Sequence, residues 1–111
     1  MRNLIGVMQG RLLPKYQGRY QAHPVHYWQE EFFIARKLGL DCIEFILDFN
    51  DIESSPLLSP KGIIEIKKII ANSGVKVRSI CADYFMHAPI HSEDPITAQT
   101  SQSILEKLIL L

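Results

Sequence analysis

The chain has 111 residues, of which 47% are apolar and 22% are charged, an ordinary balance for one small globular domain. Lys plus Arg equals Asp plus Glu at 12 each, so no basic excess points to a nucleic acid or an anionic membrane surface. The sequence has no apolar run of the roughly 18 residues that a membrane span needs, and its start lacks the features of a secretion signal. Because Cys42 and Cys81 both lie in apolar, strand-like runs, we expect reduced thiols in a cytoplasmic protein.

Strand-like and helix-like patterns alternate along the chain. Short apolar runs predict strands at residues 4–8, 41–47 and 75–82. Apolar residues at helical spacing predict helices over residues 27–38, from residue 60 to a stop at 72–74, and from residue 95 onward. The intervening segments 9–24, 48–59 and 83–93 are expected to be loops, and the first is long for a strand-to-helix connection.

Local signals mark where the predicted helices begin and end. Ser59 and Asp94 are each followed by proline, which indicates an N-cap and a first helical position. Gly39 and Gly74 are expected to stop the first two helices in the left-handed conformation.

The first predicted helix has an apolar face and charged ends. Glu30 and Glu31 suit its first turn, because the helix dipole favours acidic residues there. Four apolar residues recur at helical spacing and are expected in the core: Trp28, Phe32, Ala35 and Leu38.

This alternation predicts an α/β fold of the form βαβαβα, with parallel strands and right-handed crossovers. Three strands would leave two bare sheet edges, and the sequence "LEKLILL" carries no helix-stop signal. We therefore expect residues 1–111 to be a fragment, the first three βα units of a (β/α)8 barrel, whose usual length is about 250 residues. The alternative is a small α/β module that dimerises through its open sheet edges and binds a ligand or partner.

Ligands in parallel α/β folds bind beyond the carboxyl ends of the strands. That rule selects Gln9 and Arg11 after the first predicted strand, Glu44 and Asp48 near the end of the second, and Asp83, Tyr84 and His87 after the third. A carboxylate inside a buried strand is costly unless it is paired, so Glu44 either contacts a ligand hydroxyl or forms a salt bridge with Arg78 or Arg11. Asp83 either binds a ligand or caps the loop after it. Arg11 either holds a phosphate or carboxylate or is a solvated loop arginine.

The remaining candidates for chemistry are weaker. Four histidines lie in predicted loops: His23, His26, His87 and His91. The last two have metal-ligand spacing for a helix, but Pro89 lies between them and disfavours a helix. Lys15 and Arg19 are expected to be surface charges. The sequence contains no glycine-rich phosphate loop.

Three stretches taken together resemble the N-terminal part of the sugar-phosphate isomerase/epimerase family: "IGVMQGRLLP", "WQEEFFIARKLGLDCIEFI" and "GVKVRSICADYFMHAPI". The resemblance covers nearly the whole chain. It is closest to the branch with L-ribulose-5-phosphate and L-xylulose-5-phosphate 3-epimerases and hexulose-6-phosphate isomerase-like proteins. It implies the xylose-isomerase-like βα barrel.

The resemblance also implies an activity. Such an enzyme would move a proton next to a ketose carbonyl through an enediolate, on a small sugar or sugar phosphate, with a divalent metal in the barrel mouth. The metal ligands and catalytic carboxylates of the family lie on later strands, so no metal ligand or catalytic residue is carried over, and this chain alone is expected to be inactive. Gln9, Arg11, Glu44 and Asp83 are carried over as substrate-binding candidates.

Two questions stay open beside this reading. The wider barrel superfamily also contains metal-dependent endonucleases of abasic DNA, and the neutral charge argues against that role. Assembly into a homo-oligomer is left open.

Overall fold

A computed structural model of the chain describes residues 4–110; residues 1–3 and 111 of the predicted domain lie outside this part. The elements in chain order are β1 (Gly6–Met8), α1 (Trp28–Lys37), β2 (Cys42–Ile46), two short 3-10 helices η1 (Ile52–Ser54) and η2 (Pro56–Leu58), α2 (Pro60–Ser73), β3 (Lys76–Cys81), α3 (Tyr84–His87) and α4 (Pro95–Ile109). None of the helices in residues 4–110 has the length and apolar character needed to cross a membrane.

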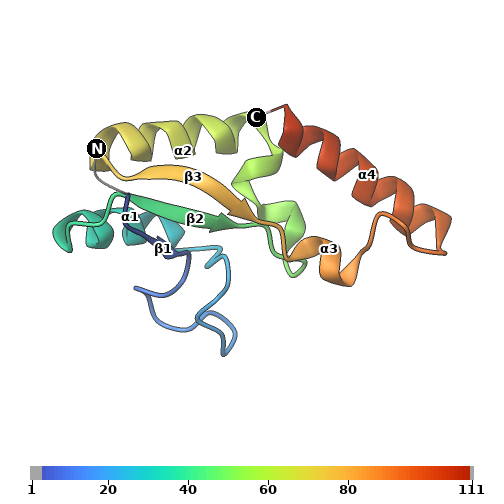
Figure 1. Ribbon diagram of the computed structural model, residues 1–111, viewed down its shortest axis with the longest axis horizontal. Helices are drawn as coiled ribbons and strands as arrows, with labels where there is room; N and C mark the ends of the chain where they lie inside the picture. Colours follow the sequence, from blue (N-terminus) through green and yellow to red (C-terminus); the bar gives the residue numbers. More distant parts are fainter. Residues whose placement is uncertain (1–3, 111) are drawn as a thin grey trace.

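The three strands form one parallel sheet in the order β1-β2-β3, as the alternation predicts (Figure 1). Met8, Glu44 and Ser79 lie side by side across the sheet. The register between β2 and β3 shifts by one residue after Ile43, which leaves Arg78 as an extra residue on β3. Such a bulge increases the local twist of the sheet.

The helices cover one face of this sheet. α1 packs on β2 and on α2, so both helices lie on the same side. The core between them contains Ile43 and Phe45 of β2, with Phe32 of α1 and Ile66 of α2. Cys42 and Glu44, which point the other way, are only partly buried, whereas Ile46 at the end of the strand is fully buried. Strand order and one-sided helices are compatible with an arc of a βα barrel.

Short-range signals in the sequence fix the helix ends. The Ser59 hydroxyl accepts a hydrogen bond from the Gly62 N–H at 3.0 Å, and Pro60 occupies the first turn of α2. Gly74 ends α2 with φ 76°, in the left-handed region. At the start of α4, Asp94 accepts from the Thr97 N–H and hydroxyl. The predicted caps are confirmed.

Two expectations about local structure are wrong. The segment 83–93, expected to be a loop, contains the single turn α3, whose last N–H bond runs from Ala88 to the Tyr84 carbonyl. Leu38, expected in the core, is 61% exposed, because it caps α1 and lies beyond its last regular turn. Trp28, Phe32 and Ala35 are buried as expected.

A test of the packing between α2 and η2 is the substitution Gly62→Ala. In a helix interior, alanine is more favourable than glycine by about 1 kcal/mol. However, a Cβ at Gly62 would overlap the backbone of Pro56 in η2. Because backbone atoms cannot move aside as a side-chain tip can, we expect a net loss of about 2 kcal/mol in the free energy of unfolding, measured in urea. Ser103→Ala on the exposed side of α4 is the control and should change stability by less than about 0.5 kcal/mol. A Gly62→Ala chain more stable than the original would show that η2 does not pack closely here.

Candidate functional site

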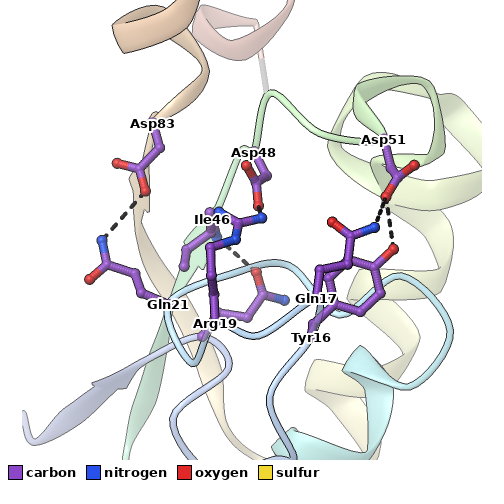
Figure 2. A network of polar contacts seen from close by, with 9 residues as sticks. Tyr16, Gln17, Arg19, Gln21, Ile46, Asp48, Asp51 and Asp83 are labelled. Atoms are coloured by element: carbon purple, nitrogen blue, oxygen red, sulfur yellow. Dashed lines mark hydrogen bonds and ion pairs between the residues drawn. The ribbon is translucent and has the colours of Figure 1, made fainter.

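A segment that we call the strap, residues 11–22, leaves β1 and crosses the carboxyl ends of the strands (Figure 2). Arg19 of the strap forms an ion pair with Asp48, directly after β2, with Nη2 and Oδ2 2.8 Å apart. The Tyr16 hydroxyl donates to Asp51 at 2.7 Å, and this hydrogen bond raises the pKa of Tyr16. The Gln17 amide donates to the same carboxylate. The Arg19 side chain is 39% exposed, as expected of a surface charge, and it also forms a contact between the strap and the β2 end.

The strap also joins two of the predicted site residues. The Gln21 amide donates to Asp83 at 3.4 Å, and its carbonyl accepts from the Arg11 guanidinium at 3.3 Å (Figure 2 shows the contact with Asp83). Arg11 and Asp83, which are far apart in sequence, thus belong to one polar chain. Both contacts are long for hydrogen bonds, so a stronger ligand could displace them.

Gln9, expected to contact a ligand, is buried beneath the surface of the candidate site. It is fully buried, its backbone N–H donates to the Glu44 carbonyl at 3.0 Å, and its side-chain oxygen accepts from the Ile46 N–H at 2.8 Å. Its Nε2 has no partner within the described part of the chain. A role in ligand binding therefore stays a prediction and would involve this amide nitrogen.

Glu44 lies on the open face of the sheet, away from the helices. It lines a shallow hollow of about 240 Å³ together with Met8, Cys42 and Ser79. Within residues 4–110 it forms no salt bridge with Arg78 or Arg11, which were the alternative partners from the sequence. Its side chain instead lines the hollow on the open face of the sheet.

The Cys81 thiol, at the end of β3, interacts both with Asp83 after the strand and with Glu44 on the open face of the sheet. It donates to Asp83 at 3.3 Å. Burial, then the bond to Asp83 and the charges of Asp83 and Glu44, raise the pKa of Cys81 to about 11. The thiol is therefore protonated at neutral pH. The charges of both predicted carboxylates, Asp83 and Glu44, reach this thiol at the end of β3.

Glu31 is the residue that sequence reasoning missed. It was interpreted as a favourable charge in the first turn of α1, and it does lie there, but it is fully buried. Its carboxylate accepts from the Gly10 N–H at 2.8 and 2.9 Å and from the Leu12 N–H at 3.1 Å. Burial raises the pKa of Glu31, and the hydrogen bonds from the two backbone N–H groups act against that shift. Gly10 has φ 93° and packs against the carbonyls of Tyr20 and Ala22 in the strap.

The loop histidine His23 is a core residue. It is 4% exposed, and its ring packs against those of both Trp28 and Phe45, with centroids 5.8 and 5.2 Å away. Neither ring nitrogen has a partner in the described residues. Burial lowers the pKa of His23 to about 4, and the charge of Asp48 only partly opposes this.

The residues present also decide whether this part of the chain could hold a metal ion. Across residues 4–110, no group of three or more His, Cys, Asp or Glu side chains lies close enough together to hold a metal ion. His87, for example, lies against the Phe49 ring, with centroids 5.4 Å apart. These residues therefore do not fit a divalent metal by themselves.

We expect His23 to make the fold sensitive to acid. Its pKa is about 4 in the folded chain against 6.5 ordinarily, so between these values only the unfolded chain takes up a proton. The free energy of unfolding should therefore fall as pH drops from about 6.5 to about 4, by about 3 kcal/mol from this group. His23→Phe, which retains an aromatic ring, should lack this component in urea unfolding at a series of pH values. The same pH dependence in both chains would contradict a buried, neutral His23.

The comparisons with known proteins point in one direction. No protein-family model matches the chain. Over 83 residues, the chain is 31% identical to the L-ribulose-5-phosphate 3-epimerase UlaE of Escherichia coli (strain SMS-3-5 / SECEC), a match covering 74% of this chain and 29% of that protein. The proteins of the same name from Salmonella paratyphi B and Salmonella heidelberg are 29% identical over 83 residues, with the same shares. The match thus spans less than a third of the length of these relatives, at 29%. These similarities support a relationship between this chain and the sugar-phosphate epimerases.

Proposed function

We propose that this chain forms three successive βα units of the (β/α)8 barrel of a sugar-phosphate epimerase or isomerase. The observation that carries the proposal is the 31% identity over 83 residues to an L-ribulose-5-phosphate 3-epimerase. The parallel sheet in the order β1-β2-β3, with α1 and α2 on one face, supports it. Successive strands of such a barrel are neighbours, and their helices all lie outside.

The two faces of the sheet support this arrangement. In a barrel, Glu44 and Cys42 would point inward, while Ile43 and Phe45 would point outward to the helices. An apolar groove of about 560 Å³ runs between α2, β3 and the end of α4, and Ile66, Ile80 and Leu108 are among the residues that line it. Within the described residues, β1 and β3 each pair only with β2. Further βα units would cover both the groove and the strand edges, and the barrel would then extend beyond this chain.

The proposed role of these residues is to bind and orient a phosphorylated ketose. Arg11 contacts only the neutral Gln21 amide among the described residues, so its guanidinium is available to an anionic phosphate. Asp83 and Glu44 would accept hydrogen bonds from sugar hydroxyls, and Gln9 would donate through Nε2. The reaction would move a proton next to the carbonyl through an enediolate, returned to the opposite face in epimerisation or to the neighbouring carbon in isomerisation. We assign neither the proton-transfer groups nor a metal ion to residues 4–110.

The proposal can be tested by exchanging the matching segment of the E. coli L-ribulose-5-phosphate 3-epimerase for this chain. The chimera should convert L-ribulose 5-phosphate to L-xylulose 5-phosphate, followed by NMR. Asp83→Asn and Glu44→Gln should each lower kcat/KM about tenfold or more, because each removes a charged hydrogen-bond acceptor.

The control for this exchange is Glu106→Gln, which removes an exposed carboxylate of α4 and should leave kcat/KM within about twofold. Circular dichroism would establish that each chimera is folded. A folded chimera without activity would rule out the proposed function. If neither substitution changed kcat/KM, Glu44 and Asp83 would not be part of the binding site.

A separate expectation concerns the 111-residue chain by itself. Incubated with L-ribulose 5-phosphate and Mg²⁺ or Mn²⁺, it should show no turnover, because the proposed proton-transfer groups are not among its residues. NMR of the sugar over several hours would measure this. Metal-dependent turnover by the isolated chain would mean that these residues contain a complete catalytic site.

A further inference from the structure

The turn after β1 is a backbone anion site that is filled from within the chain. The N–H groups of Gly10 and Leu12 converge on the Glu31 carboxylate, with three N–O distances of 2.8, 2.9 and 3.1 Å. Backbone N–H groups that converge in such turns bind anions in many proteins. The N–H of Arg11, between these two donors, bonds to the Met8 carbonyl instead. Here the anion is a side chain of α1, and it is fully buried.

Closing a turn does not by itself require a buried charge. No Lys, Arg or His pairs with Glu31 within the described residues, so its charge is balanced only by backbone dipoles. A buried carboxylate held in this way is costly compared with a neutral side chain. What it provides is a strong, directional fixation of the turn, because hydrogen bonds to an ionised acceptor are about twice as strong as neutral ones.

The turn is also fixed from two other directions. Gln9 bonds to β2 through its backbone N–H and through its side chain. A Cβ at Gly10 would overlap the Tyr20 carbonyl, so the strap presses directly on the turn. Arg11 lies between these fixed residues, and only its side chain extends outward, to Gln21.

We propose that Glu31 is a positioning residue that holds Arg11 in place for a phosphate group of the ligand. The proposal rests on the proposed function for the identity of that ligand, a phosphorylated sugar. It assigns Glu31 no contact with the ligand and places its effect entirely on the Arg11 backbone.

The test is a double-mutant cycle on the binding of inorganic phosphate by the 111-residue chain, measured by NMR titration. Arg11→Gln and Glu31→Gln should each weaken phosphate binding about five- to tenfold. In the Arg11→Gln background, Glu31→Gln should have no further effect, because it acts through Arg11. Ile104→Val, a buried change in α4, controls for general loss of stability and should leave phosphate affinity unchanged.

Chemical rescue covers the case in which Glu31→Gln does not fold. Formate should fill the vacated turn of a Glu31→Ala chain and return the Gly10 and Leu12 amide resonances and the phosphate affinity to those of the original chain in the same formate. Formamide, which is neutral, should not. A Glu31→Ala chain that regains neither in formate would overturn the proposal.

The remaining outcomes separate this inference from the function on which it rests. Independent, additive effects of the two glutamine substitutions would overturn the positioning role, and so would the absence of phosphate binding by the original chain. If the cycle is coupled but L-ribulose 5-phosphate binds no better than inorganic phosphate, the positioning role stands and the proposed sugar substrate fails.

Discussion

Parallel pairing of the three strands is the constraint on which the other features of this chain depend. Because the strands run in one direction and in chain order, the segments that leave their carboxyl ends meet at one edge. Gln9 extends the pairing beyond β1, since its N–H bonds to Glu44 and its side-chain oxygen accepts from Ile46. A side chain that takes over a ladder hydrogen bond lets β1 end without leaving a buried N–H of β2 unpaired. The start of the strap is therefore set by the sheet.

Local pattern was sufficient for the three strands and the three longer helices and, in principle, for Glu31. Caps and stops such as Ser59 and Gly74 act over a few residues, so the ends of α2 could be predicted closely. Glu31 lies three residues after Trp28 and four before Ala35, on the buried face of the helix. It was interpreted as a first-turn charge because its partners are backbone N–H groups, and a backbone donor has no signature in the sequence. Helical spacing indicated burial, but nothing local indicated what would satisfy the charge.

The strap contacts could not be predicted in the same way. Arg19 and Asp48 are 29 residues apart, and Gln21 and Asp83 are 62 apart. No period links such pairs, and the conformation of a long loop depends on contacts that exist only after the sheet has formed. The strand-end rule did select Arg11 and Asp83, because it uses topology and not the loop. It could not indicate that Gln21 would join them, nor that His23 would pack in the core beneath the loop.

The candidate site has negative charges on the side of the strands and a positive charge on the side of the strap. On the side of the strands, Glu44 and Asp83 both act on the Cys81 thiol, whose pKa of about 11 keeps it from adding a further negative charge. On the side of the strap, the charge of Arg19 is matched by Asp48, while Arg11 meets only an amide. A ligand with hydroxyls at one end and an anionic group at the other complements this division, whereas a ligand charged alike at both ends does not. Since the sheet fixes the carboxylates and the Glu31-bound turn fixes Arg11, the orientation of such a ligand would be decided before any proton moves.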